Sequence, residues 1–295
     1  MPRCGGPGPL PYPGPADHTT RQGIGRGDPL VRLNPTECTH ARTRFPTYLC
    51  EGCDTTRDHL RGCASCRRAW NRYRWDIAAT TLLYAELRAF LGASFTPYLD
   101  SSEVLAREWR ARPPGADIAD FFRHSTAYLY NLAIWQASGH RPDYCAAGIP
   151  LLHELGVRTV LDFGCGIGND TLPLLDAGFQ VTGCDYDSPS TAFLRHRSRH
   201  PITVVDPDHV RTLPPFDAVW IIDTLDHLPD IDAAIGPLMR TTQVLVCENL
   251  AVPRGVTGKG FHRQLTLAQF TELASRYGLR PAPLPADSPI MAWRR

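Results

Sequence analysis

The chain has 295 residues and a net charge of +1, and 43% of its residues are hydrophobic. This length allows one large domain with a smaller accessory module. The near-zero charge gives no general attraction to nucleic acid, and no apolar run approaches the roughly 20 residues of a membrane helix. The first residues, Met-Pro-Arg-Cys-Gly-Gly-Pro, lack the apolar stretch of a secretory signal, so we expect a cytoplasmic protein. A high content of Arg, Ala and Pro with a single lysine is typical of a GC-rich bacterial genome.

Composition divides the chain into four segments. Residues 1–36 are rich in Pro and Gly and bury too little apolar surface to offset the entropy of ordering, so they are predicted to be a disordered tail. A cysteine-rich module follows at 37–70, then a helical region at 71–145 that we expect to cover the substrate. Residues 146–295 form the predicted α/β domain.

Two Cys-x-x-Cys pairs, Cys50/Cys53 and Cys63/Cys66, are separated by nine residues. Clustered cysteines in a cytosolic protein indicate metal ligands more than disulfides, and each pair can present two thiolates to a tetrahedral ion. We therefore predict one structural zinc ion held by Cys50, Cys53, Cys63 and Cys66.

Other uses of the cysteine-rich module stay open. Cys38 and His40 could complete a site with Cys50 and Cys53, and an iron–sulfur or redox role is a further alternative. The module could have a purely structural role and hold the neighbouring helices in place. Its arginines could instead contact phosphates, because residues 37–75 hold eight arginines against four acids.

Apolar periodicity predicts two helical faces in residues 71–145. One is formed by Trp75, Ala78, Leu82, Leu83, Leu87, Phe90 and Leu91, the other by Phe121, Phe122, Tyr128, Leu132 and Trp135. Pro113-Pro114-Gly115 separates them. Tyr128 and Tyr130 are candidates for lining a lid, although a core or surface role fits them too.

Short apolar runs alternate with helical stretches from residue 146 onward. Strands are expected at 158–163, 179–184, 202–206, 216–222, 243–248, 279–284 and 289–294. Helices are expected at 147–155, 168–178, 188–198, 230–240 and 266–277. This alternation predicts an α/β fold, a Rossmann-like doubly wound sheet of seven strands. The last two strands should form a hairpin, which makes the final strand antiparallel. We expect Cys145, Cys165, Cys184 and Cys247 to be small buried side chains.

The first strand leads into a glycine-rich turn within Val160-Leu-Asp-Phe-Gly-Cys-Gly-Ile-Gly-Asn-Asp170. Asn169 stands where the dinucleotide pattern G-x-G-x-x-G requires its last glycine, so that pattern is absent. Acids end the next two strands, at Asp185 and Asp206. A carboxylate at the end of the second strand is placed to accept both ribose hydroxyls of a nucleotide. Tyr186 could pack on an adenine, and Asp206 could contact the adenine edge.

The D-x-G-x-G-x-G spacing resembles motif I of the class I S-adenosylmethionine (SAM) dependent methyltransferases. The fourth strand, Phe216-Asp-Ala-Val-Trp-Ile-Ile-Asp-Thr-Leu-Asp-His227, resembles the FD-V-…-L-E-H-L segment of ubiquinone-type and natural-product methyltransferases, with Asp226 where Glu is usual. The resemblance covers roughly residues 145–295. It implies a cofactor site formed by Asp162, Gly164, Cys165, Gly166, Gly168, Asp185, Tyr186, Asp206 and Asp223.

Methyl transfer needs positioning and, for some acceptors, removal of a proton. Asp223, Asp226 and His227 are the catalytic candidates, with His227 as general base. His227 could instead cap a short helix or line the cofactor pocket, and Asp162 could merely cap the turn. Asp187 and Asp208 are expected to be helix N-caps, and Asp217 to bind backbone groups. Lys259 and His262 are second-tier pocket candidates.

The segment Asp223-Thr-Leu-Asp-His lacks both the Pro-Pro-aromatic motif of nucleobase amino-methyltransferases and the nucleophilic cysteine of cytosine C5 enzymes. We therefore expect a methyltransferase acting on O, N or C of a small molecule. The alternatives are an RNA or protein methyltransferase guided by the zinc module, and a non-catalytic SAM-binding zinc regulator. Nucleic acid is not the favoured partner, no membrane partner is expected, and the sequence makes no prediction of oligomeric state.

Overall fold

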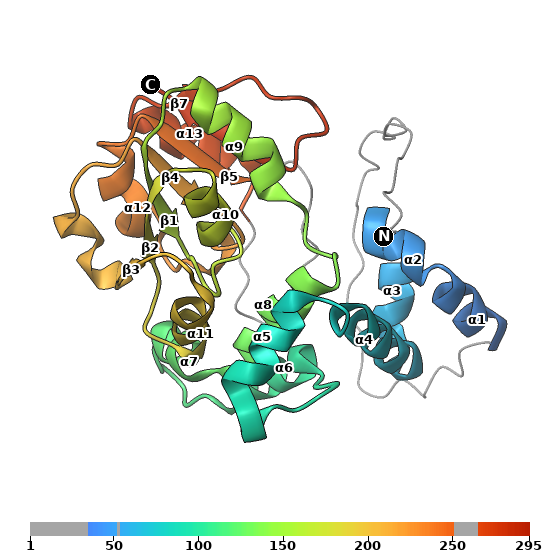
Figure 1. Ribbon diagram of the computed structural model, residues 1–295. Helices are drawn as coiled ribbons and strands as arrows, with labels where there is room; N and C mark the ends of the chain where they lie inside the picture. The colour runs from blue at the N-terminus through green and yellow to red at the C-terminus, as the bar shows by residue number, and fades with distance from the viewer. Residues whose placement is uncertain (1–34, 52–53, 251–264) are drawn as a thin grey trace. The chain divides into compact units, whose positions relative to one another are not determined.

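The computed structural model describes residues 35–51, 54–250 and 265–295 (Figure 1). The predicted disordered tail lies outside these residues except at its end, and so do Lys259 and His262. The chain divides into two compact units, Met1–Tyr73 and Arg74–Arg295, which are described separately. No helix of the described residues has the length and apolar character needed to cross a bilayer.

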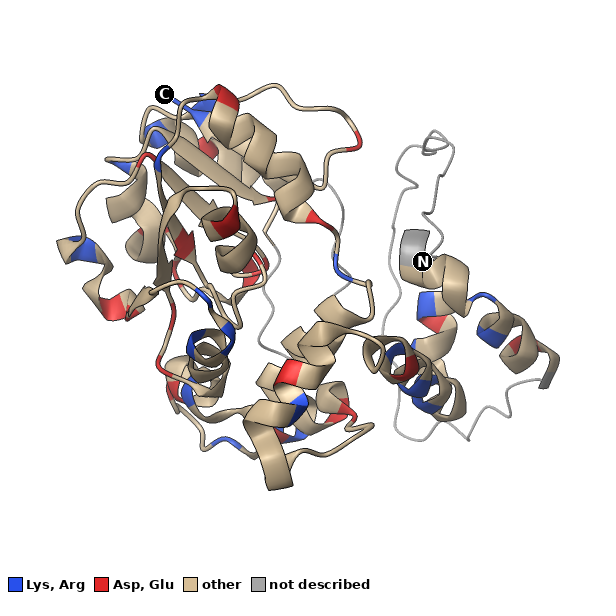
Figure 2. Ribbon diagram, viewed as in Figure 1, with Lys and Arg blue, Asp and Glu red and all other residues tan. Residues whose placement is uncertain are grey.

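Four helices form the described part of the first unit. They are α1 (Pro35–Thr43), α2 (Phe45–Glu51), α3 (Asp54–Gly62) and α4 (Ala64–Ala78), and the division between the units falls within α4. Their core is small, with Phe45, Leu60, Cys63, Cys66 and Trp70 buried. Arginines and acids both occur on these helices (Figure 2).

The second unit begins with further helices that precede the sheet. They are α5 (Leu82–Leu91), the 3-10 turn η1 (Gly92–Ser94), α6 (Ser101–Ala111), α7 (Ile118–His124) and α8 (Thr126–Ala137). Trp75, Leu87, Leu129, Ile134 and Phe193 are among the buried residues of their core.

Both predicted faces of the helical region are interrupted by helix N-caps. Thr81 caps α5 by accepting the N–H of Tyr84, and Leu82 is 66% exposed, so the prediction of one face from Trp75 to Leu91 was wrong. Ser125 likewise caps α8, which separates the phenylalanines of α7 from Tyr128. A Ser or Thr hydroxyl that accepts the orphan N–H at N3 favours starting a new helix over continuing the old one.

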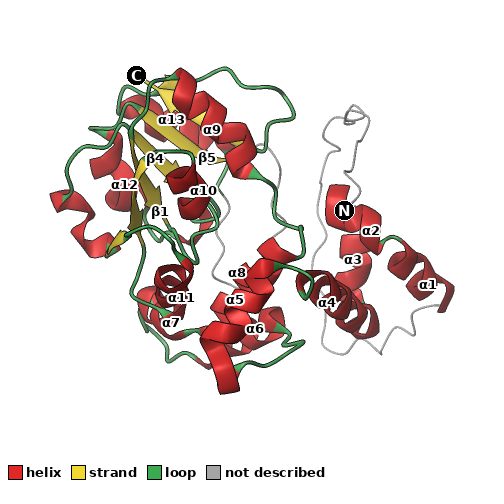
Figure 3. Cartoon of the chain, in the orientation of Figure 1, coloured by secondary structure: helices red, strands yellow, loops and turns green. Residues whose placement is uncertain are grey.

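The sheet has the expected seven strands, in the order β3-β2-β1-β4-β5-β7-β6 (Figure 3). They are β1 (Thr159–Phe163), β2 (Gln180–Cys184), β3 (Thr203–Val205), β4 (Ala218–Ile221), β5 (Val244–Glu248), β6 (Arg280–Pro281) and β7 (Ile290–Arg294). The first five are parallel, and β7 runs antiparallel to both β5 and β6. The fold is thus the predicted mixed α/β sheet with a reversed last strand. Strand β6 is shorter than predicted; its Pro281 has no N–H to donate to a ladder.

Helices cover both faces of the sheet. They are α9 (Tyr144–Glu154), α10 (Thr171–Asp176), α11 (Pro189–Arg197), α12 (Ile231–Met239) and α13 (Leu267–Arg276), with 3-10 turns η2 (Pro207–Thr212) and η3 (Leu225–His227). Alternate residues of a strand point to opposite faces. Leu161 and Val219 accordingly pack with α12 and α13, whereas Val160 and Trp220 pack with α9 and α10. Because β2 and β4 both pair in parallel with β1, the carboxyl ends of these three strands lie side by side.

Candidate cofactor and active site

The glycine turn after β1 has a backbone that other residues adopt poorly. Gly164, Gly166 and Gly168 have φ values of +83°, +50° and +79°. A Cβ added at Gly164 would lie 2.0 Å from the Thr224 hydroxyl oxygen, and one at Gly168 would lie 2.2 Å from a Leu194 methyl carbon. The N–H of Gly164 donates to the Cys184 carbonyl at 2.7 Å. The turn is therefore fixed to the end of β2, and its glycines are required by both space and conformation.

Asp185 follows β2 and faces the turn. Its carboxylate accepts the N–H of Gly166 at 2.8 Å and that of Tyr186 at 2.7 Å. Burial raises the pKa of Asp185 to about 6 even though both hydrogen bonds favour the charged form. At neutral pH the side chain is consequently an oriented carboxylate.

Asp162, on β1, lies deeper than Asp185. It is 3% exposed, and the Thr171 hydroxyl at the start of α10 donates to it. Burial, followed by the charge of nearby Asp170, raises the pKa of Asp162 to about 8. Asp162 thus joins β1 to the start of α10 and also lines the pocket described below.

Arg141 and Asp170 form a buried ion pair that sequence analysis did not single out. The guanidinium donates through Nη1 to Oδ1 at 2.9 Å and through Nη2 to Oδ2 at 2.5 Å, and both side chains are 7% exposed. The pair joins the loop after α8 to the end of the glycine-rich stretch. No spacing rule relates two residues 29 positions apart, so the sequence offered no signal for it.

Tyr186 lies beneath a cation from the helical region. The Arg123 guanidinium is 4.6 Å from the Tyr186 ring centre and pairs with Asp206 at 3.3 Å and with Asp208 at 3.6 Å. Asp206 also caps η2 by accepting the Asp208 N–H at 2.9 Å. Arg123 therefore connects α7 to the ends of both β2 and β3.

Two N-cap predictions near these acids were wrong, because other residues take the cap positions. Asp206 rather than Asp208 caps η2, and Ser188 rather than Asp187 caps α11. Asp187 instead pairs with Arg195 at 2.8 Å. Asp217 binds backbone as predicted, accepting the N–H groups of Arg158 and Thr159.

The catalytic candidates follow β4. Asp223 has φ +55°, and its N–H donates at 3.0 Å to Glu248, a buried residue at the end of β5 that sequence analysis did not single out. Asp226 and His227 lie on η3, with 3.6 Å between the carboxylate oxygen and the imidazole Nε2. Their side chains are 10% and 12% exposed, respectively.

One pocket brings most of these groups together. Its lining includes Asp162, Gly164, Cys165, Gly166, Asp170, Asp185, Tyr186, Asp223 and His227, with Phe122, Tyr128 and Trp135 from the helical region. Tyr130 lies elsewhere, in the core, where its hydroxyl accepts the Thr96 N–H at 2.6 Å. Gly168, Asp206 and Asp226 do not line the pocket but lie beside residues that do. Cys145, Cys165, Cys184 and Cys247 are all buried, as predicted.

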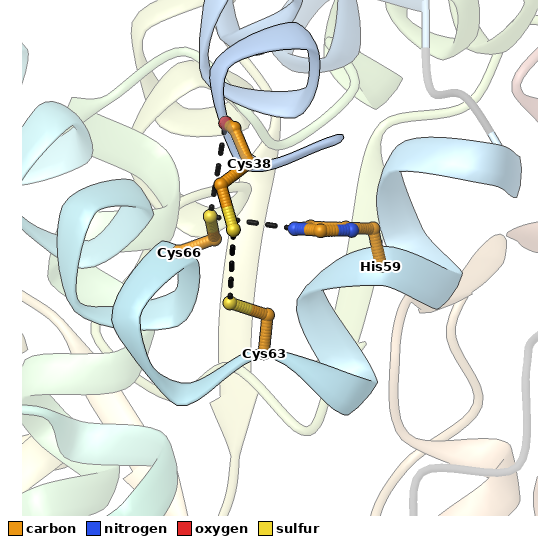
Figure 4. A group of neighbouring side chains, drawn as sticks. All are labelled: Cys38, His59, Cys63 and Cys66. Carbon is orange, nitrogen blue, oxygen red and sulfur yellow. Dashed lines mark hydrogen bonds between the residues drawn. The ribbon is translucent and has the colours of Figure 1, made fainter. Parts of the chain in front are cut away.

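In the first unit, the predicted metal ligands fall into two groups. Cys53 and the side chain of Cys50 lie outside the described residues, so their part of the prediction stays untested. Cys63 and Cys66 lie beside Cys38 and His59, all four ligand atoms being within 4.8 Å of one another (Figure 4). His40 is exposed and is not part of this group. His59 was missed because it belongs to neither Cys-x-x-Cys pair.

Comparison with known proteins concerns the α/β domain. Residues 161–243 match the model of a methyltransferase domain family. A ubiquinone biosynthesis O-methyltransferase of Paramagnetospirillum magneticum is 32% identical over 83 residues, which are 26% of this chain and 33% of that protein. The chain therefore spans about a third of the length of this curated relative.

Solved structures of low sequence identity were also matched. The magnesium protoporphyrin IX methyltransferase of Synechocystis, with bound S-adenosylhomocysteine, is 15% identical over 72% of this chain and 99% of its own, with a TM-score of 0.42. Streptomyces venezuelae DesVI is 15% identical over 58% and 98% of the two chains, with a TM-score of 0.44. The family match thus identifies a methyltransferase domain within residues 161–243, and the sheet order agrees with the fold that the sequence resemblance predicts.

Proposed function

We propose that the protein transfers a methyl group from SAM to an oxygen, nitrogen or carbon atom of a small molecule. One observation carries the proposal. The glycine turn after β1, the carboxylate after β2 and the Asp223–His227 segment after β4 line a single pocket. In open α/β sheets, ligands bind at the carboxyl ends of the strands, where these three groups lie.

The geometry of the glycine turn and of Asp185 is compatible with binding the cofactor SAM. A Cβ is excluded at Gly164 and Gly168, and the Asp185 carboxylate is held by two N–H groups. Thr224 and Leu194 occupy the space that side chains at these glycines would need, so the glycines keep the turn tight. Gly164 and Gly166 line the pocket with backbone alone. In this proposal, Gly164 and Gly166 hold the methionine portion, Asp185 the ribose and Tyr186 the adenine. When bound there, SAM supplies an electrophilic methyl group on a positively charged sulfur.

His227 is the proposed general base in this arrangement. Its imidazole lines the pocket, and the Asp226 carboxylate 3.6 Å from Nε2 favours the protonated ring that forms when a proton is taken from an acceptor. Asp223 is held by the buried Glu248 through its backbone N–H. Glu248 would thus position the Asp223 side chain.

The pocket walls support an acceptor with an apolar body. Phe122, Tyr128 and Trp135 contribute aromatic surface to the same pocket as the polar strand ends, and they would also exclude water from the reacting atoms. The curated relative is named an O-methyltransferase, so hydroxyl-bearing aromatic compounds are the acceptors to test first.

The test is methyl-labelled SAM incubated with the full chain and, separately, with a low-molecular-mass cell extract, purified RNA and cell protein. We expect label to appear in the small-molecule fraction, together with stoichiometric S-adenosylhomocysteine, and to be lost with Asp185→Ala. Label in RNA or protein would replace the proposed acceptor class with a macromolecule. A protein that binds SAM and labels no fraction would contradict the proposed enzymatic role.

A further inference from the structure

The first unit brings four metal-ligating side chains together from three helical segments. Cys38 lies on α1 and His59 in the last turn of α3, while Cys63 separates α3 from α4 and Cys66 lies in the first turn of α4. Cys63 and Cys66 are buried and the other two are partly buried. Figure 4 shows the three sulfurs and the imidazole directed toward a common centre.

Two distances among the four ligand atoms match the edges of a metal tetrahedron, and all four atoms lie within 4.8 Å of one another. With zinc–sulfur bonds of about 2.3 Å and zinc–nitrogen bonds of about 2.0 Å, tetrahedral angles separate two sulfurs by about 3.8 Å and a sulfur and nitrogen by about 3.5 Å. The Cys38 and Cys63 sulfurs are 3.7 Å apart, and the His59 Nε2 is 3.4 Å from the Cys66 sulfur. A disulfide would need about 2.0 Å between sulfurs. The spacing therefore suits four ligands around an ion and excludes a Cys38–Cys63 disulfide.

Packing alone provides little stability to this part of the chain. Two of the five residues in its buried core are the ligand candidates Cys63 and Cys66, and Phe45, Leu60 and Trp70 complete it. Segments of about 40 residues generally need a metal, disulfides or association to fold. Cys38, Cys63 and Cys66 are all free thiols, so a metal ion is the remaining cross-link among the described residues.

We infer that Cys38, His59, Cys63 and Cys66 bind one structural Zn²⁺ ion, as a Cys3His site that joins α1, α3 and α4. All four positions of a tetrahedral ion are filled by protein, which leaves no place for a catalytic water. This assignment differs from the Cys4 site that the paired Cys-x-x-Cys motifs predict, because it replaces Cys50 and Cys53 with Cys38 and His59.

Zinc binding to these four side chains releases protons and leaves a small net charge. Three thiols release one proton each as Zn²⁺ binds, and the imidazole of His59 coordinates through neutral Nε2, so the occupied site carries a net charge of −1. Arg42 lies at its edge, donating at 2.8 Å to the hydroxyl of Ser65, which is located between Cys63 and Cys66. Its guanidinium supplies the compensating positive charge.

The first test uses the full-length protein without substitution. Metal analysis should give one zinc per chain and no stoichiometric iron. X-ray absorption at the zinc edge should give three sulfur ligands at about 2.3 Å and one nitrogen ligand at about 2.0 Å. Four sulfur ligands or an iron centre would overturn the assignment. So would a protein that holds no zinc either as purified or after zinc is added back.

Substitutions distinguish the two candidate ligand sets. In competition with a chromophoric chelator, Cys38→Ser and His59→Gln should weaken zinc affinity by more than about 100-fold, exceeding the usual cost of losing an outer-shell partner. Cys50→Ser, Cys53→Ser and His40→Gln are the matched controls and should stay within about threefold of the parent. The reverse pattern would establish the Cys4 site instead.

His59→Cys keeps the test informative if a truncated ligand prevents folding. Cysteine can replace histidine as a zinc ligand, so this variant should retain one zinc ion and change the absorption spectrum from three sulfurs and one nitrogen to four sulfurs. A spectrum that keeps its nitrogen ligand would show that His59 does not bind the ion.

Discussion

The Asp185 carboxylate accepts the backbone N–H of Gly166 at 2.8 Å, which connects the acid after β2 to the glycine turn after β1. A second bond, from the Tyr186 N–H, fixes the other carboxylate oxygen. Both oxygens keep lone pairs available for hydroxyl donors, since each accepts one backbone donor. This arrangement orients the carboxylate before any ligand arrives.

Asp185→Ala should abolish measurable SAM binding. The variant would lose the two charge-assisted hydrogen bonds proposed to the ribose, each contributing about 1.5–3 kcal/mol, so the Kd should rise at least about 100-fold. Calorimetric titration checks this. Asp187→Ala, which changes an exposed acid two residues away, is the matched control and should bind normally. Full binding by Asp185→Ala would contradict the proposed cofactor site.

SAM affinity should fall between pH 7 and pH 5. The pKa of Asp185 is raised to about 6, so the carboxyl is mostly ionised at pH 7 and mostly protonated at pH 5, with about a tenfold loss of the binding form. Titrations across this range test the decline. Asp185→Asn should remove the pH dependence along with most of the affinity.

The raised pKa of Asp185 also affects the free energy of unfolding, which should be larger at low pH, whereas SAM affinity should be smaller there. The native state holds the Asp185 proton more tightly than the unfolded chain, whose ordinary pKa is 3.8. The contribution of this group to the free energy of unfolding is therefore full below about pH 4 and is lost as the pH rises through about 6. Asp162, whose pKa is also raised, contributes a slope of the same sign, so chemical denaturation without cofactor should show a steeper slope between pH 4 and pH 6 in the parent than in Asp185→Asn.

Gly164→Ala should destabilise the fold more than Gly178→Ala. Both positions have positive φ, +83° and +93°, so both variants incur backbone strain of about 1 kcal/mol. Only at Gly164 does the new Cβ also meet another residue, the Thr224 side chain at 2.0 Å. We expect a total cost of about 2–4 kcal/mol there, measured by urea denaturation. Equal costs would show that the turn can move away from Thr224.

Sequence analysis predicted the seven strands, because each buried strand is a short apolar run followed by a turn residue or an acid, and the short connection before the last strand predicted its reversed direction. The turn at Gly164 and the acid at Asp185 were visible for the same reason. Contacts between side chains that are distant in sequence could not be predicted in this way. Arg123 reaches Asp206 across 83 positions, and no local pattern distinguishes it from other surface arginines.

The helical region was harder to predict than the sheet. Apolar periodicity continues from Trp75 to Leu91, yet Thr81 caps a new helix within that run. Periodicity reports which residues are apolar and not where the chain turns between them. His59 is a related case, because it lies in the last turn of α3, four residues before Cys63, and its proximity to Cys38 depends on how α1 packs.

Arg141→Ala should be among the most destabilising single substitutions in the second unit. It would leave Asp170 buried without its bidentate partner, at a cost of about 3–5 kcal/mol. Arg195→Ala is the control, since its pair with Asp187 is exposed and should contribute less than about 1 kcal/mol. Thermal and urea unfolding of both variants test the difference. A small loss for Arg141→Ala would mean that water reaches Asp170.

His227→Ala should lower kcat by roughly 10²- to 10⁴-fold if the imidazole removes the acceptor proton. SAM affinity should stay within a few-fold of the parent, because His227 is not among the contacts proposed for the methionine portion, the ribose and the adenine. The comparison uses kcat and KM in the label-transfer assay with the first acceptor identified. If His227 only lines the pocket, His227→Ala should raise KM and leave kcat nearly unchanged.

Asp226→Asn supplies the matched test of the proposed base. Without the carboxylate 3.6 Å from Nε2, the positive imidazole that forms on proton removal loses its stabilising charge, so kcat should fall while the Kd for SAM stays within a few-fold of the parent. The label-transfer assay and calorimetric titration measure the two quantities. An unchanged kcat in Asp226→Asn would place the general base elsewhere. A loss of kcat in both Asp226→Asn and His227→Ala, with SAM binding retained, would support the imidazole as the base.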